Sequence, residues 1–445
     1  MPSLPEARRF GCAALIYAAC VVYGSLVPLA YRYRPLAEAW EAFLRIPYLQ
    51  LGLGSRADWV ANILLYIPLG FLASGWLCAR VRGAPASVLV FGLCAALAVA
   101  VEFAQLFFPP RTVSLNDLVA ECLGTGVGIA LWYATGERLS RLWGELQRGG
   151  HAGARALIVL YSAAYLAFAL FPYDLLVSAS ELAQKLASPR SWTFFFTGSC
   201  GGALSCGTKL LAEVLTAAPL GAFLGMMALP GRPFGVARAF VLGILFGAVI
   251  EGLQIFLASG MSQGASILTR GLGIALGLSF YRFFRKEWLI EYRLHMQMVA
   301  LAALPLYLVL LLAMIGYFAS DLEGRWAASA KLRQVQFLPF YYHYFTTEAQ
   351  AMYSLLLHAG AYAPIGLLVW ILRDGRGERT SLWLSALAAL FTAAAMETLK
   401  LFLDGRKPDP TDTLIAAAAA ALACFAATRL AHWTGANQRI EQRVG

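Results

Sequence analysis

Stretches of about 20 mostly apolar residues recur along the whole of this 445-residue chain, and they restrict its fold more than any other feature. An α-helix needs about this length to cross the hydrocarbon core of a bilayer. Charged residues form only 13% of the chain, whereas soluble domains contain roughly 25%. We therefore predict an all-α fold, a polytopic integral membrane helical bundle.

The apolar stretches predict about 12 transmembrane helices. Arginine-rich linkers divide these helices into three sets of four, so we predict three repeats, at residues 1–145, 146–292 and 293–445. The predicted spans lie near residues 11–30, 58–79, 86–108, 115–135, 156–173, 207–229, 236–258, 266–283, 298–319, 350–372, 380–403 and 411–431.

Two landmarks recur in each block: a Pro-Leu-Gly or Pro-Ile-Gly sequence within one span, and a glutamate near the end of the next span. The distance from this proline to this glutamate is 34, 32 and 33 residues in the three blocks. Spacings matched this closely predict a triplicated domain. The prolines are Pro68, Pro219 and Pro364, and the glutamates are Glu102, Glu251 and Glu397.

Basic residues predict the topology of the chain. Lysine and arginine are concentrated in the short connectors after the even-numbered spans, as at Arg80 and Arg82. Cytoplasmic loops carry such an excess. We therefore predict that both termini lie in the cytoplasm and that the glutamates at the span ends lie at the outer side. The net charge of +10 follows from this topology and does not indicate nucleic-acid binding. The first long connector, with Arg32, Arg34 and Arg45, predicts a helix lying at the membrane interface.

Polar side chains also occur at one position of the second span in every block. Asp58 and Asn62 are four residues apart and therefore share one helix face. Since polar groups are costly in lipid, this face is predicted to look inward, either to hold helices together by hydrogen bonds or to bind a ligand. The matching pairs in the later blocks are Lys209 with Glu213 and Ser354 with His358.

The outward helix ends collect further polar residues, and three interpretations of them stay open: a buried ion-pair network, a polar binding site, or catalysis. The middle block keeps the helix glutamate but has Gly260, Ser266 and Arg270 where the first block has Arg111, Asp117 and Glu121, so it is predicted to be degenerate. The candidate ligand-binding residues are Asp58, Asn62, Glu102, Gln105, Arg111, Asp117, His358, Glu397, Arg406 and Asp412.

Several other chemistries lack a pattern in this sequence. No histidine or cysteine cluster has zinc spacing, His343 and His358 stand isolated, and no Walker A or dinucleotide motif is present. We therefore predict no catalytic residue, no metal site and no cofactor. Cys200 and Cys206 lie in a connector on the predicted outer side, where disulfides persist, and form a candidate disulfide.

The first block resembles the VanZ-like domain, a bacterial membrane domain named after the teicoplanin-resistance protein VanZ. The resemblance rests on Asn62, Pro68-Leu69-Gly70, Glu102-x-x-Gln105, Arg111, Asp117 and Gly124 and covers about residues 1–136. Residues 337–420 resemble it moderately and residues 192–280 weakly. The family implies an integral membrane protein connected with the bacterial cell envelope, in the plasma (inner) membrane.

Together these features lead us to expect non-enzymatic binding or organisation of envelope components at the outer leaflet. Expected partners are membrane lipids, a lipid-linked glycan or exported polysaccharide, and envelope-assembly proteins, with an effect on glycopeptide antibiotic susceptibility. Arg111 and Arg406 are then expected to pair a phosphate, and Asp117 and Asp412 to accept hydrogen bonds from sugar hydroxyls. A lipid or solute transporter or flippase is the alternative, and an intramembrane enzyme using Glu102 or Glu397 is less favoured.

Overall fold

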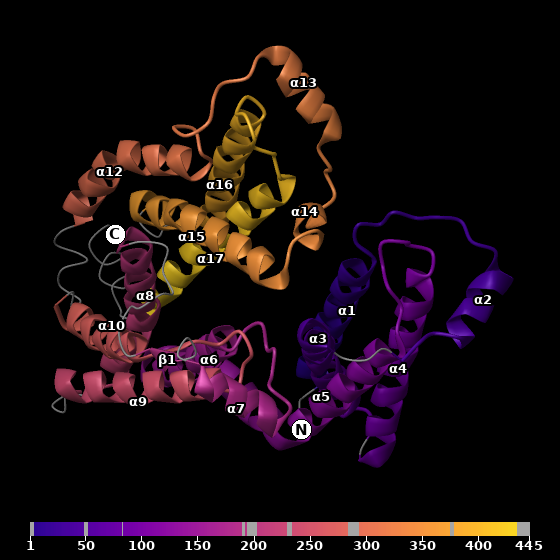
Figure 1. The fold of residues 1–445 in the computed structure, drawn as a ribbon. Helices are drawn as coiled ribbons and strands as arrows, with labels where there is room; N and C mark the ends of the chain where they lie inside the picture. Colours follow the sequence, from indigo (N-terminus) through magenta and orange to yellow (C-terminus); the bar gives the residue numbers. More distant parts are fainter. Residues whose placement is uncertain are drawn as a thin grey trace. The chain divides into compact units, whose positions relative to one another are not determined.

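The computed structural model describes residues 4–48, 52–81, 83–188, 192–193, 203–228, 234–283, 293–373 and 378–433. The chain divides into two compact units, at residues 1–281 and 282–445 (Figure 1). The described residues are almost entirely helical, so the predicted all-α fold is confirmed. Their one sheet is the parallel pair β1 (Trp192–Thr193) and β2 (Ser262–Gln263).

Unit 1 begins with the helices of the first predicted block and continues with those of the second. The first set is α1 (Leu4–Leu26), α2 (Leu36–Leu44), α3 (Leu53–Leu77), α4 (Ala84–Gln105) and α5 (Leu115–Arg148). The second set is α6 (Gly150–Ala169), α7 (Ala179–Ala187), α8 (Ala203–Met227), α9 (Val236–Gln254) and α10 (Gly264–Phe283).

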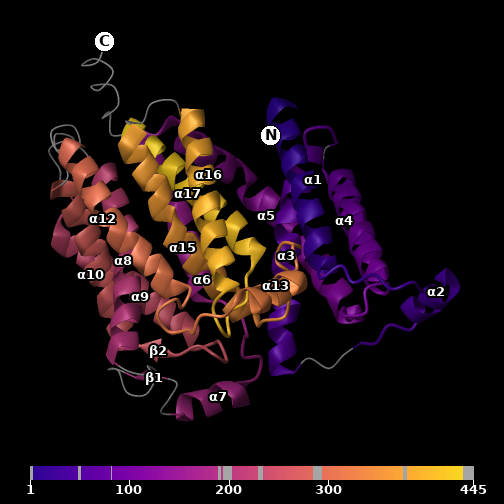
Figure 2. The same ribbon diagram turned by 90° about the horizontal axis from the view of Figure 1, so that it is seen from above.

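Unit 2 contains the helices of the third predicted block, and its four long helices lie alongside one another (Figure 2). Its core is apolar and is centred on Tyr362, Leu403 and Ala420. The helices are α12 (Arg293–Met314), α13 (Arg325–Gln334), α14 (Tyr341–Tyr344), α15 (Glu348–Arg373), α16 (Glu378–Lys400) and α17 (Pro410–Trp433).

Eleven helices of the described chain are long and apolar enough to cross a membrane. They coincide with eleven of the predicted spans, and the chain is therefore a multi-pass membrane protein. The twelfth predicted span, at 266–283, forms the helix α10 but is not among the eleven. This helix carries Arg270 and Arg282 together with several glycines, which makes it less apolar than the others.

The glycine of each Pro-Leu-Gly or Pro-Ile-Gly sequence lies against the backbone of another helix. A Cβ at Gly70 would lie 2.6 Å from the carbonyl oxygen of Thr125 in α5. Gly221 and Gly366 approach α10 and α17 in the same way. Since a side chain there would collide with backbone, these glycines let two helices of each block pack closely.

Candidate functional site

One polar contact joins the second span of each block to the last one. In the first block, Asn62 Nδ2 donates to Asp117 Oδ1 at 2.7 Å. In the second, Ser266 Oγ donates to Glu213 Oε1 at 2.8 Å, and in the third, His358 Nε2 lies 3.1 Å from Asp412 Oδ2. The helix face that carries Asn62 and its counterparts thus turns toward a neighbouring helix, as predicted. Asp58, one turn earlier, is exposed.

A second contact uses the helix glutamate as a cap for the helix that follows. Glu251 Oε2 accepts the backbone N–H of Gln263 at 2.5 Å, and Glu397 Oε2 accepts that of Asp409 at 2.8 Å. Glu102 interacts with the backbone N–H of Ser114. The first N–H groups of a helix have no partner within it, so a carboxylate there satisfies them. In each of the three blocks, the glutamate therefore has a structural role as a cap for the following helix.

The three places differ in what neutralises this glutamate. In the middle block, Arg270 Nη1 lies 2.5 Å from Glu251 Oε1, and both side chains are almost fully buried. The Arg270 Nε also donates to the hydroxyl oxygen of Tyr165 at 3.2 Å. Both charged groups of this buried ion pair thus have further hydrogen-bond partners: Gln263 N–H for Glu251 and the Tyr165 hydroxyl for Arg270.

The first block has Glu121 where the middle block has Arg270. Glu102 and Glu121 are each only 3% exposed. Within the described part of the chain, the Oε2 atom of each glutamate is buried without a partner in hydrogen-bonding geometry, and the Tyr66 hydroxyl is the polar group that interacts with the Glu121 carboxylate. Buried polar atoms without partners are rare and costly, and they concentrate at functional sites. The sequence pointed to Glu102 here, but it gave Glu121 no place among the candidates.

The third block has a lysine in place of the glutamine that follows the glutamate. Lys400 Nζ lies 2.6 Å from Glu397 and 3.4 Å from Asp412, so one ammonium group serves two carboxylates. His358 Nδ1 also contacts the carbonyl oxygen of Ser354 at 2.8 Å. Three predicted residues, Glu397, Asp412 and His358, therefore meet in one network.

The glutamines of the first two blocks have a matching structural task. Gln105 Nε2 donates to the Ser25 carbonyl at 3.0 Å, and Gln254 Nε2 donates to the Ala169 carbonyl at the same distance. Each amide thereby ties the end of one long helix to the end of the first helix in its block. Gln105 Oε1 stays buried without a hydrogen-bond partner among the described residues.

The two loop arginines, Arg111 and Arg406, donate hydrogen bonds to groups in other segments of the chain. Arg111 donates to the carbonyl oxygen of Gly24, at the end of α1. Arg406 is exposed, packs over Gly316 and donates to Ser320 Oγ at 3.4 Å. Neither Arg406 nor Asp58 belongs to the buried carboxylate clusters, so the structure does not bring all ten predicted residues together.

A cavity of about 550 Å³ opens beside Gln105 and Arg111. The first long connector folds over this end of α4, held by hydrogen bonds from Arg32 N to Phe107 O and from Leu115 N to Pro47 O. Four arginines line the cavity, against one acidic residue, Glu38. The sequence predicted a basic interfacial connector but not that it would fold back on this helix end. The lining arginines are Arg32, Arg34, Arg45 and Arg111.

The candidate disulfide can be followed only in part. Cys206 is disulfide-bonded, whereas Cys200 lies outside the described residues. Their pairing stays a prediction. The cysteines in the rest of the described chain are free thiols, at positions 12, 20, 78, 94, 122 and 424.

Comparison with known proteins identifies the first block. Residues 14–136 match the family model described as VanZ/LLP1. No curated protein and no solved structure matches the chain. The matched residues hold α3, α4, the arginine-lined cavity at Gln105, and most of α5, so the predicted resemblance is confirmed there, while the three-repeat organisation stays a prediction. The chain is therefore a multi-pass membrane protein that contains a VanZ-like region at residues 14–136.

Proposed function

We propose that this protein binds phosphorylated lipid-linked glycan precursors, or a related exported polysaccharide intermediate, at the outer leaflet of the bacterial inner membrane. The observation that carries the proposal is the cavity lined by Arg32, Arg34, Arg45 and Arg111. Guanidinium groups form paired hydrogen bonds with phosphate, and they stay charged at any physiological pH. Binding there would hold or organise envelope precursors and alter susceptibility to glycopeptides.

The position of the cavity suits a lipid headgroup rather than a free solute. It lies at the end of the span α4, where the apolar part of the chain gives way to the connector helix α2. Leu36, Trp40 and Leu44 of α2 are exposed apolar side chains, as in helices that lie in the membrane interface. A headgroup in this cavity would keep its acyl or polyprenyl chain in lipid.

The aspartates contribute less to this proposal than the sequence suggested. Asp117 accepts hydrogen bonds from Asn62 at Oδ1 and from Ser114 Oγ at Oδ2, both at 2.7 Å. Asp412 lies within the network of His358 and Lys400. Both carboxylates are therefore engaged within the protein, and the proposal rests on the arginines.

The test is to identify the lipids that remain bound to the purified full-length protein. Mass spectrometry of extracts from wild type is expected to show phosphorylated polyprenyl species enriched over the bulk membrane lipids. The variant Arg34→Ala/Arg45→Ala should lose this enrichment, while Arg138→Ala/Arg141→Ala, which changes two arginines of α5 outside the cavity, should keep it. Equal enrichment in both variants would contradict the proposal.

A transporter is the second candidate, and the buried Oε2 atoms of Glu102 and Glu121 favour it. Carboxylates inside membrane proteins often carry protons or ions along a transport route. In proteoliposomes, movement of a fluorescent polyprenyl phosphate between leaflets should then depend on both glutamates. Movement that is unchanged in Glu102→Gln and Glu121→Gln would exclude this candidate.

A further inference from the structure

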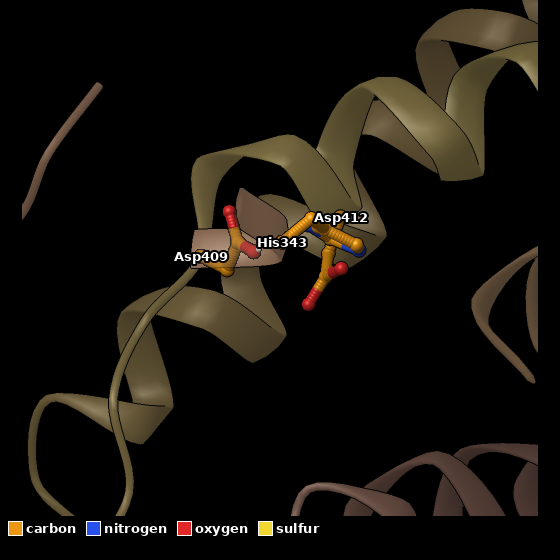
Figure 3. A group of neighbouring side chains, drawn as sticks. All are labelled: His343, Asp409 and Asp412. Carbon is orange, nitrogen blue, oxygen red and sulfur yellow. Dashed lines mark ion pairs between the residues drawn. The ribbon is translucent and has the colours of Figure 1, made fainter. Parts of the chain in front are cut away.

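We propose that unit 2 contains a divalent metal site of the zinc class, formed by His343, Asp409 and Asp412. One ligand atom of each residue lies within 4.8 Å of one ligand atom of each of the others. Figure 3 shows the His343 side chain of α14 beside Asp409, in the loop just before α17, and Asp412, in the first turn of α17. Imidazole nitrogen and carboxylate oxygen are ordinary ligands of Zn²⁺.

The distance between His343 and Asp409 is close to that between two ligands of one bound ion. His343 Nδ1 lies 3.5 Å from Asp409 Oδ2. Two ligands bound to Zn²⁺ at about 2.0–2.1 Å in tetrahedral geometry lie about 3.3 Å from each other. This separation is too long for a good hydrogen bond but suits two atoms that face a common ion.

His343 is the observation that points to an ion rather than to a simple ion pair. Both its ring nitrogens are buried, and neither has a hydrogen-bond partner among the described residues. The side chain as a whole is 11% exposed. A buried imidazole normally satisfies at least one nitrogen, because leaving a buried polar group unsatisfied costs about 1–3 kcal/mol. A metal bond to one nitrogen would remove this cost.

The aspartates are held in place by other groups, as metal ligands usually are. Asp409 Oδ1 accepts the backbone N–H of Thr411 at 2.9 Å, which turns Oδ2 toward His343. Asp412 Oδ2 is contacted by His358 Nε2 at 3.1 Å and by Lys400 Nζ at 3.4 Å. Both carboxylates are therefore oriented before any ion binds.

A second group of possible ligands shares Asp412 and adds His358 and Glu397. In that group Lys400 Nζ already lies 2.6 Å from Glu397 Oε1 and occupies the place of a cation. The structure thus assigns the ion to the group with His343. Because α14 belongs to the connector before α15, the ion would join this connector to the start of α17.

The test uses the full-length protein purified in detergent with an affinity tag that contains no histidine. After treatment with a chelator, wild type should take up one Zn²⁺ per chain, and Zn²⁺ should raise its thermal midpoint, since a ligand that binds only the folded state stabilises it. His343→Ala and Asp409→Asn should each bind Zn²⁺ at least tenfold more weakly. His432→Ala, which changes an exposed histidine of the same helix α17, should bind like wild type.

Co²⁺ distinguishes this site from other ligand sets and does not depend on how well the variants fold. Bound to wild type, Co²⁺ should give the visible absorption of a site with nitrogen and oxygen ligands. Charge-transfer absorption typical of thiolate ligands would place the ion at cysteines and overturn the proposal. Wild type that binds no stoichiometric Zn²⁺ would overturn it too, as would binding that His358→Ala abolishes and His343→Ala leaves intact.

Discussion

The first and middle blocks of unit 1 build the same helix joint and complete it with opposite chemistry. Glu102 and Glu251 each cap the helix that follows, and Gln105 and Gln254 each reach the end of another helix. In the middle block Arg270 completes a buried ion pair, whereas Glu121 adds a second acid in the first block.

The difference between Arg270 and Glu121 shows that the helix joint and the charged groups beside it can vary independently. The middle block shows that the joint can be satisfied entirely within the protein. The first block leaves Glu102 and Glu121 each with an unsatisfied oxygen and places four arginines around a cavity nearby. Because natural proteins rarely bury unsatisfied groups without a use for them, we assign the structural role to the middle cluster and the binding role to the first.

Breaking the ion pair of the middle block should have the largest effect. Arg270→Ala leaves Glu251 buried without its basic partner and should cost on the order of 3–5 kcal/mol of stability. Thermal unfolding of the detergent-solubilised protein, with the yield of folded protein, measures this. The double variant Arg270→Ala/Glu251→Ala should recover part of the loss, because no unpaired charge remains. Wild-type stability of Arg270→Ala would remove the structural role of this cluster.

The close helix contacts should be equally sensitive in both blocks. Gly70→Ala and Gly221→Ala place a Cβ against the backbone carbonyls of Thr125 and Ile274. Each change should cost about 1–3 kcal/mol, as overpacking of a well-packed core does. Gly92→Ala is the matched control, since no atom lies within 4 Å of a Cβ at this position of α4. A much smaller loss at Gly70 than at Gly221 would show that the two scaffolds differ.

Replacing the glutamates by glutamine should separate the two clusters most clearly. Glu121→Gln keeps the shape of the side chain and removes an unsatisfied carboxylate, so stability should change by less than about 1 kcal/mol. Glu251→Gln leaves Arg270 buried without a counter-charge and should cost more than this. Unfolding of both variants under the same conditions gives the comparison. A larger loss for Glu121→Gln than for Glu251→Gln would reverse our assignment.

Much of the fold was predictable because membrane spans are long and apolar. The sequence placed every long helix of the described chain, including α10, whose arginines make it less apolar than the rest. It also predicted that the helix face with Asn62 looks inward. Asp58 and Asn62 share this face, and polar side chains within a membrane need hydrogen-bond partners from other helices. A helix was predicted in the first connector, where α2 lies. The short helices α7, α13 and α14 lie in the other connectors, where apolar periodicity gives little signal.

The sites were less predictable, because their members meet only in three dimensions. Arg270 was recognised as a replacement for Glu121, yet its ion pair with Glu251 depends on how α9 and α10 pack. His343 stands isolated in the sequence, and only the fold of the connector brings it to Asp409. The basic character of the first connector could be read from its composition. That it folds back toward Arg111 depends on backbone hydrogen bonds, which the sequence does not predict.

The most direct test measures the affinity for a polyprenyl diphosphate and the thermal midpoint on the same samples. Wild type, Arg34→Ala/Arg45→Ala and the control Arg138→Ala/Arg141→Ala are compared in phosphatidylcholine nanodiscs. Loss of charge-assisted hydrogen bonds, each worth about 1.5–3 kcal/mol, predicts at least tenfold weaker binding by the cavity variant, with an unchanged thermal midpoint. Unchanged affinity in that variant, or an equal loss in the control, would contradict the assignment of binding to the first block.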